Sequence, residues 1–402
     1  MPKKLLLVPL LHLLVVLTSL ISNVACNTPV RPQPLLGDDI ITPLEGKVHY
    51  ATIISNTLIY STFNPYAQEQ SSAFLLRAID LQTNRTLWSN SIEVVAPIIG
   101  DDHNLFAVTT EGLIKLLTNS GQIEWMLSDL DIFPSFEDDE IILAEDVIFY
   151  STANNLYAID SNSGLKLWNQ PTPAKQPGSR VVYHEGKIYT HGTINLASRT
   201  FGLIAINTLD GTLAWQLPFS AQFSIQDLVP RVISADPVIG NRLLYFSDIY
   251  NSTLYAVDYE TGHVEWKRDN TILMKPIFHQ GSLISVAQLN LSDGSVIPSI
   301  MRFNPNNRKT EWNNPLTEIM DSSSINQGED MVLFDDYLAL HSWDNNINQI
   351  IVIDATTGKV IIKRELDLNG ECKLSAHLSF IFQDDTLYLI TSDCVHSFKY
   401  LR

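Results

Sequence analysis

A strand–turn–strand pattern of hydrophobic and polar residues returns along most of the chain. In its clearest copy, an apolar strand begins at Leu156, has Ala158 at its centre and reaches Asp160. A polar turn then ends at Gly164, and a second strand carries Trp168 four residues later. Apolar strands joined by a short turn that contains Asp and Gly are typical of β-hairpins, so the pattern predicts a repeated hairpin.

Seven copies of this hairpin align. Their shared positions are Asp80 and Trp88; Gly121 and Trp125; Asp160, Gly164 and Trp168; Gly211 and Trp215; Asp258, Gly262 and Trp266; Trp312; and Asp354 and Gly358. The aspartate side chain accepts hydrogen bonds from backbone N–H groups in the turn, and glycine supplies the positive φ that a tight connection needs. We expect the tryptophan to pack between neighbouring sheets, with its indole N–H bonded to an acceptor. In the copy that ends at Trp312, Arg308 stands at the glycine position, and we expect Asn307 to take the positive φ instead.

A second repeated feature gives the number of units. Tight polar turns between short apolar strands occur eight times, at Ser55-Asn56, Asp101-Asp102, Glu145-Asp146, Glu185-Gly186, Gly240-Asn241, Gln280-Gly281, Asp335-Asp336 and Asp384-Asp385. Together with the hairpin, each turn makes a unit of four antiparallel strands. Units of four strands repeated every 40 to 50 residues or so indicate a β-propeller.

The eighth unit lacks one strand before the chain ends at Arg402. An open sheet edge exposes unpaired backbone groups, so a ring needs its last sheet completed. The stretch from Arg31 to Pro43 precedes the first unit and is predicted to supply the missing outer strand. The expected fold is therefore an all-β, eight-bladed propeller closed by an N-terminal strand. The alternative is seven full blades plus a partial one.

Composition and charge narrow the classes of function. The chain has 402 residues, 45% of them hydrophobic, and the repeat covers nearly all of it, which predicts one propeller domain over residues 39–402 and a monomer. The formal net charge of −18 repels phosphate backbones, so nucleic-acid binding is not expected.

The N-terminus has the basic, apolar and small-residue regions of a secretory signal, predicted as residues 1–25. Cys26 follows Val24-Ala25 and resembles the lipidated cysteine of a bacterial lipobox, although Asn23 stands where lipoboxes usually carry Leu. We expect an exported protein anchored to a bacterial membrane through a lipid on Cys26, with residues 26–38 as tether. The alternative is cleavage beside an incidental cysteine and secretion.

Two further cysteines lie near the C-terminus, at Cys372 and Cys394. A hairpin centred on Asp384-Asp385 brings them within a few residues of each other. An exported protein permits a disulfide, so the two cysteines form either a disulfide or a pair of buried free thiols.

Loop lengths predict the binding surface. In a blade with strands A to D from the axis outward, the A–B and C–D turns lie on one face, and the B–C and D–A connections lie on the other. The first set is tight, whereas the second includes long stretches, among them 127–138, 192–200, 288–298 and 342–349. Rigid scaffolds carry binding on such loops. Candidate partner contacts are Phe133 and Phe136 in an acidic loop and Trp343 at the start of another, and loop packing is the alternative role of these residues.

The repeated sequence motif, Ala-Ile-Asp followed by Ser/Thr-Gly and then Trp, resembles the pyrroloquinoline-quinone-like (PQQ-like) propeller repeat over roughly residues 45–402. That family includes quinoprotein alcohol dehydrogenases and a lipid-anchored scaffold subunit of the outer-membrane β-barrel assembly machinery. The resemblance to the dehydrogenases implies adjacent cysteines over the quinone, and this chain has no Cys-Cys pair. The resemblance to the scaffold implies no cofactor.

No catalytic motif stands out. Asp335-Asp336 and Asp384-Asp385 are expected to be turn carboxylates rather than calcium ligands, and His184 has no second histidine at metalloprotease spacing. We therefore expect no catalytic, cofactor-binding or metal-binding residues. The predicted function is a protein-binding scaffold of the cell envelope, and the alternatives are a PQQ-dependent oxidoreductase or a sensor of sugars or peptides.

Overall fold

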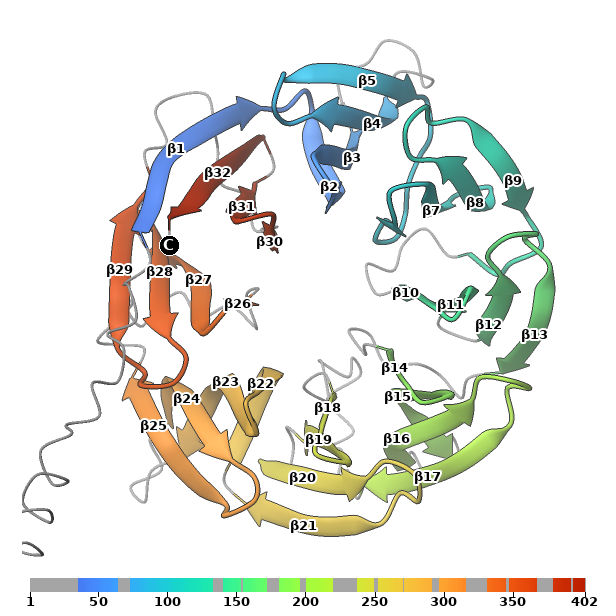
Figure 1. Cartoon of the computed structure of the whole chain (residues 1–402). Coiled ribbons are helices and arrows are strands. Elements are labelled where there is room, and N and C mark those ends of the chain that lie inside the picture. The colour runs from blue at the N-terminus through green and yellow to red at the C-terminus, as the bar shows by residue number, and fades with distance from the viewer. Residues whose placement is uncertain are drawn as a thin grey trace, which may run out of the picture.

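The computed structural model describes fourteen segments of the chain, namely residues 35–63, 73–132, 140–152, 155–171, 181–195, 200–219, 237–248, 252–269, 271–290, 296–315, 331–344, 347–366, 379–391 and 393–401. These segments form eight four-stranded antiparallel sheets arranged in a ring (Figure 1). The predicted eight-bladed propeller is therefore confirmed. In the described part of the chain, no helix has the length and hydropathy that a membrane crossing requires.

Blades are numbered in chain order, and their strands run from A at the axis to D at the rim. Blades 1 to 4 contain β2 (Lys47–Ile54), β3 (Thr57–Phe63), β4 (Phe74–Asp80) and β5 (Arg85–Asn90); β6 (Ile99–Gly100), β7 (Asn104–Thr109), β8 (Gly112–Leu117) and β9 (Ile123–Leu127); β10 (Glu140–Ala144), β11 (Val147–Ser151), β12 (Asn155–Asp160) and β13 (Lys166–Pro171); and β14 (Val182–His184), β15 (Lys187–Asn195), β16 (Thr200–Asn207) and β17 (Leu213–Phe219). Blades 5 to 8 contain β18 (Val238–Gly240), β19 (Leu243–Asp248), β20 (Thr253–Asp258) and β21 (Val264–Asp269); β22 (Thr271–His279), β23 (Ser282–Asn290), β24 (Val296–Asn304) and β25 (Lys309–Pro315); β26 (Val332–Phe334), β27 (Tyr337–Asp344), β28 (Ile347–Asp354) and β29 (Val360–Glu365); and β30 (Ser379–Gln383), β31 (Thr386–Ile390), β32 (Cys394–Leu401) and β1 (Leu35–Pro43).

Burial along the strands follows their place in the blade. The B strands β3 and β7 are buried almost throughout, because neighbouring blades cover both of their faces. The D strands β13 and β21 alternate between half-buried and exposed positions, since one of their faces meets solvent. The buried apolar residues of the described segments form eight clusters, and each lies between two neighbouring blades. Each sheet thus covers the apolar face of the next.

In blades 1 to 4 and in blade 6, the repeated tryptophan bonds its blade to the one that follows. Trp215, on the D strand of blade 4, donates its indole N–H to the carbonyl oxygen of Tyr259 in blade 5, at 2.9 Å. Its ring also covers Gly262, the turn glycine of blade 5. Corresponding indole bonds run from Trp88 to Thr118, from Trp125 to Ser161, from Trp168 to Thr208 and from Trp312 to Ala355. The predicted acceptor for the indole is therefore a backbone carbonyl of the next blade.

The small residue at the centre of strand C makes room for this ring. Ala158, Ala205 and Ala256 lie directly opposite Trp168, Trp215 and Trp266 in the C–D pairs. A register shift follows each of these pairs, and strand C then ends at the aspartate or asparagine that recurs in the repeat, namely Asp160, Asn207 or Asp258. In the clearest copy, the Asp160 carboxylate accepts the Ser163 hydroxyl at 2.6 Å and the Ser163 N–H at 2.7 Å, and these bonds lower the pKa of Asp160.

The turn of blade 6 corrects one expectation. Arg308 takes φ +60°, whereas Asn307 was expected to do so. The register of the hairpin places the left-handed conformation at the glycine position whichever residue stands there. In compensation, the Arg308 guanidinium lies 5.7 Å from the ring centre of Trp266, on the preceding blade.

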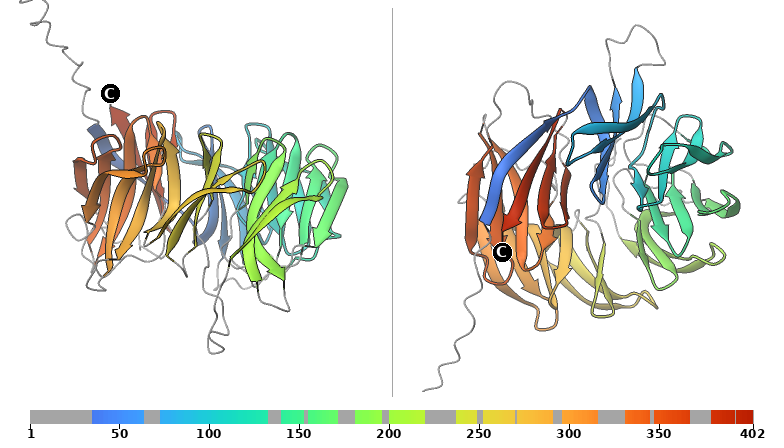
Figure 2. Two further views of the ribbon diagram at one scale, coloured as in Figure 1. Left: turned by 90° about the horizontal axis from the view of Figure 1, so that it is seen from below. Right: turned by 45° about the horizontal axis from the view of Figure 1, so that its top comes forward.

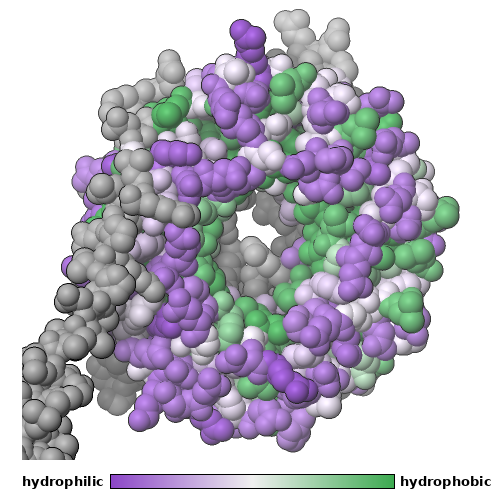
Figure 3. Space-filling model, in the orientation of Figure 1, coloured by the Kyte–Doolittle hydropathy of each residue, from purple (hydrophilic) through white to green (hydrophobic). Residues whose placement is uncertain are grey.

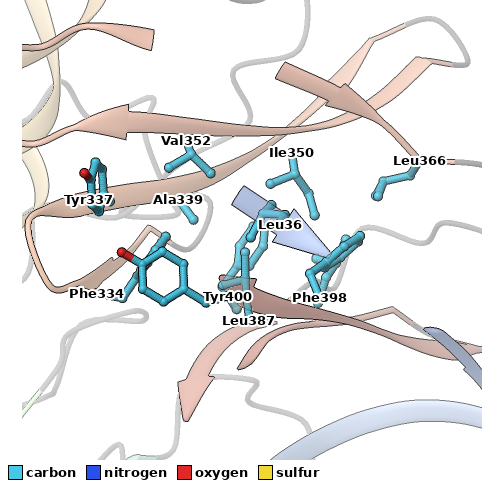
Figure 4. Close-up of a cluster of buried hydrophobic side chains, with 12 residues drawn as sticks. Leu36, Phe334, Tyr337, Ala339, Ile350, Val352, Leu366, Leu387, Phe398 and Tyr400 are labelled. Carbon is cyan, nitrogen blue, oxygen red and sulfur yellow. The ribbon is translucent and has the colours of Figure 1, made fainter. Parts of the chain in front are cut away.

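The N-terminal strand closes the ring, as predicted. β1 pairs with β32, from Leu35 opposite Leu401 to Pro43 opposite Cys394, and forms the outer strand of blade 8. It begins at Leu35, within the stretch expected to be tether. Leu36 is 6% exposed and lies with Phe398 and Tyr400 in the cluster between blades 7 and 8 (Figure 4). The two ends of the described chain therefore hold one sheet together.

Candidate partner-binding face

The strands run between two faces of the ring, which differ in their connections (Figure 2). We call the face with the A–B and C–D turns the turn face, and the face with the B–C turns and D–A connections the crossover face. All eight predicted A–B turns are tight in the structure. Many of their residues have positive φ, among them Glu145, Asp146, Asp384 and Asp385, which explains the preference for Asp and Gly.

Carboxylates on the turn face join neighbouring blades. Ser55 donates to Asp102 of the next blade, and the Tyr259 hydroxyl donates to Glu185 at 2.7 Å. The His279 ring lies 3.1 Å from Asp336, so this carboxylate is not simply solvated, as its turn position had suggested. No three His, Cys, Asp or Glu side chains in the described segments come together as a possible metal site. Polar side chains cover most of the ring surface seen in Figure 3, around a central opening.

A cavity of about 630 Å³ lies on the turn face where blades 1, 2 and 8 meet, and it is lined by Ser55, Asp101, Asp102, His103 and Gln383, among others. The Asp101 carboxylate accepts hydrogen bonds from its own turn. One of its oxygens accepts the N–H groups of Asn104, at 2.7 Å, and His103, at 2.8 Å. Partial burial by itself would raise the pKa of Asp101. The hydrogen bonds from Asn104 and His103 outweigh burial and leave this pKa below its usual value.

Several stretches predicted as loops on the crossover face are strands. Residues 192–195, 288–290 and 342–344 continue B strands, and each pairs with the C strand that follows. Antiparallel pairing continues here because it satisfies backbone groups that a loop would leave to solvent. Trp343, expected to begin a loop, lies in β27 opposite Asn348. Phe133 and Phe136 lie outside the described residues, so their contact role stays a prediction.

A hydrogen-bond network holds the segment just before Phe133. The Asp131 carboxylate accepts the Tyr157 hydroxyl and the Asn155 amide, the latter at 2.9 Å. Burial, aided by the bond to Asp131, raises the pKa of Tyr157 to about 12. Lys166 lies 5.2 Å from the Tyr157 ring centre and donates to the Asp129 carbonyl at 2.8 Å. The D–A connection between blades 2 and 3 is therefore fixed to blade 3 where the predicted contact loop begins.

A groove of about 540 Å³ lies on the crossover face where blades 1 and 2 meet. We call it the blade 1–2 groove, and its lining residues are Phe74, Ser91, Ile92, Glu93, Thr109, Thr110, Glu111, Ile114, Ile123 and Met126. None of them was a candidate from the sequence, because the prediction rested on long loops and blade 2 has only a two-residue B–C turn.

Cys394 is buried and disulfide-bonded. Cys372, its predicted partner, and Cys26, the predicted lipidation site, both lie outside the described residues. The Cys372–Cys394 pairing therefore stays a prediction, as does the lipid.

The sequence matches the family model described as outer membrane protein assembly factor BamB over residues 72–314, more than half of the chain. The chain belongs to this family. A solved BamB structure from Moraxella catarrhalis aligns with a TM-score of 0.61 at 16% identity, covering 91% of this chain and 99% of that one. Comparison with curated protein sequences gives no significant match.

Enzymes share the propeller fold of the BamB family. The quinohemoprotein alcohol dehydrogenase of Comamonas testosteroni aligns with a TM-score of 0.60 at 9% identity, covering 91% of this chain and 76% of the enzyme. A europium-containing methanol dehydrogenase aligns with a TM-score of 0.56 at 12% identity, over 89% of this chain and 84% of the enzyme. At these identities the similarity shows the fold alone.

Proposed function

We propose that this chain is an exported, lipid-anchored scaffold of the cell envelope that binds a protein partner on its crossover face. Membership of the BamB family carries the proposal, because that family is described by its part in outer-membrane protein assembly. The signal-like N-terminus and Cys26 support the location. The irregular connections and the blade 1–2 groove support the choice of face, since rigid scaffolds bind through such features.

Pull-down from envelope extracts of the source organism tests the binding. The purified chain, immobilised through its C-terminus, should retain a protein that Trp343→Ala retains less well. Leu209→Ala is the control, because Leu209 is 91% exposed in a C–D turn on the opposite face. A loss only with Leu209→Ala would contradict the choice of face, and equal retention by wild type and both variants would remove Trp343 from the contact.

Mass spectrometry of the membrane-extracted protein tests the anchor. A diacylglycerol-modified Cys26 at the mature N-terminus is expected, and Cys26→Ser should release the protein into the soluble fraction. An unmodified N-terminus at another residue would remove the anchor from the proposal and leave the binding function standing.

A quinoprotein oxidoreductase is the second candidate, favoured by the two dehydrogenase structures that share the fold. The residues fit it poorly: the chain has no adjacent cysteines, and the described residues bring together no group of three metal-ligating side chains. Incubation with pyrroloquinoline quinone and Ca²⁺ separates the two functions. Stoichiometric quinone uptake with dye-linked alcohol oxidation would favour the enzyme.

A further inference from the structure

The short B–C connection of blade 2 forms one side of the blade 1–2 groove. Thr109 ends β7 and closes the turn: its hydroxyl accepts the Gly112 N–H at 3.1 Å and donates to the Gly112 carbonyl at 2.8 Å. Only Thr110 and Glu111 separate the two strands. The outer strand β9 presents exposed apolar side chains beside the groove, with Ile123 at 42% and Met126 at 46% exposure.

The floor of the groove is apolar and well supported. Ile114 is fully buried in the cluster between blades 1 and 2, and Ile92 packs against that cluster. Phe74, at the opposite wall, stacks on Phe63 with 4.9 Å between ring centres. Met126 adds a flexible side chain that adapts to different apolar partners. Aromatic residues and Met are enriched where proteins bind proteins.

Two carboxylates flank this floor, on Glu93 and Glu111. Their backbones are held side by side, because the Thr110 N–H donates to the Glu93 carbonyl at 3.3 Å and Val94 bridges Thr109. Neither carboxylate makes an ion pair with a described residue. The cation nearest to Glu111 in sequence, Lys115, is bonded to Glu124 at 2.9 Å.

We infer that the blade 1–2 groove binds an extended segment of the partner protein in which a Lys or Arg adjoins a large apolar residue. The apolar side chain contacts Phe74, Ile92 and Met126, above the buried Ile114, and the cation lies between Glu93 and Glu111. The inference rests on the proposed function and names a site for it. It also gives a chemical class of ligand, since two unpaired carboxylates beside an apolar floor complement a basic, apolar segment.

Fluorescence anisotropy with labelled peptides tests the inference on the full chain. The probe is amidated Lys-Phe-Lys-Phe-Lys, compared with Glu-Phe-Glu-Phe-Glu and Lys-Ser-Lys-Ser-Lys. Only the first is expected to bind at micromolar concentration and moderate salt. Equal binding of the Lys-Ser peptide would show that the overall negative charge alone attracts cations, and would overturn the inference.

Variants then locate the binding. Glu93→Gln with Glu111→Gln, and separately Met126→Ser, should each weaken the Lys-Phe peptide at least tenfold. Matched controls remove the same chemistry elsewhere: Glu265→Gln with Glu365→Gln, both exposed, for the charges, and Leu167→Ser, 52% exposed on β13, for the apolar contact. Weakening by the controls as large as that by the groove variants would overturn the proposed site.

The pull-down distinguishes failure of this inference from failure of the proposed function. If wild type and the groove variants retain the same envelope protein equally, the partner binds elsewhere, so the groove inference fails and the scaffold function stands. If the wild type retains no envelope protein, the scaffold function itself fails. A retained protein whose binding is lost in the groove variants and preserved in their controls supports both.

Discussion

Replacing Gly262 by alanine tests whether tryptophan contacts between blades stabilise the ring. Gly262 has φ +74°, and an added Cβ would lie 2.7 Å from the Trp215 ring. An L-residue in this conformation costs about 1–2 kcal/mol, and forcing a methyl group against a packed ring costs a further 1–3 kcal/mol or so. We therefore expect Gly262→Ala to lower the free energy of unfolding by about 2–5 kcal/mol.

Gly281 provides a matched control for the backbone part of this cost. It has φ +77°, but an added Cβ would meet nothing within 4 Å. Gly281→Ala should therefore lose only about 1–2 kcal/mol, the backbone share. Urea unfolding followed by circular dichroism measures both variants. Equal losses would refute the reasoning, because the contact with Trp215 would then contribute nothing.

Three further predictions concern other contacts. Asp131→Asn should lower the pKa of Tyr157 from about 12 toward 10, because the buried phenol loses an anionic acceptor; ultraviolet titration at 295 nm measures it, and an unchanged pKa would leave burial as the only cause. Arg364→Met should reduce stability by about 2 kcal/mol and speed proteolysis of β1, because Arg364 donates to two β1 carbonyls, whereas the exposed Arg85→Met should change neither. His191 is fully buried, and burial lowers its pKa to about 3. Below about pH 6.5 this histidine is therefore protonated in the unfolded chain but neutral in the native state, so the free energy of unfolding falls as the pH is lowered. His191→Gln should remove about 2 kcal/mol of that loss between pH 7.5 and 5, measured by urea unfolding at both pH values; an unchanged slope would contradict it.

The fold was predictable because its determinants are local and repeated. Asp160, Gly164 and Trp168 lie within nine residues, and each acts through turn geometry or a ring contact with the next unit. The closing strand was also predictable, since a ring that lacks one strand needs an outer partner for β32. The conformation of Arg308 was not, because residue preference favours Asn at positive φ, whereas hairpin register decides the position.

The candidate site was less predictable, because loop length is a poor measure of where a strand ends. Trp343 lies in β27 because the pairing with β28 continues to Asp344, past the residue where the loop was expected to begin. The residue preferences of this stretch do not reveal the longer strand. The blade 1–2 groove was missed for the opposite reason. Glu93 and Met126 are 33 positions apart in the sequence, and only the packing of two blades brings them together.

The closing strand also relates the proposed anchor to the proposed binding face. Leu35 pairs with Leu401 at the C–D end of blade 8, so β1 enters the propeller from the turn face and leaves at Pro43 toward the crossover face. From Cys26 to Leu35 the chain spans at most about 30 Å when fully extended. If Cys26 carries the proposed lipid, the chain from the lipid enters the propeller at Leu35, on the turn-face side of the rim. Under the proposed anchoring, we expect the crossover face to point away from the membrane surface, which leaves the blade 1–2 groove accessible to a partner that extends from the membrane.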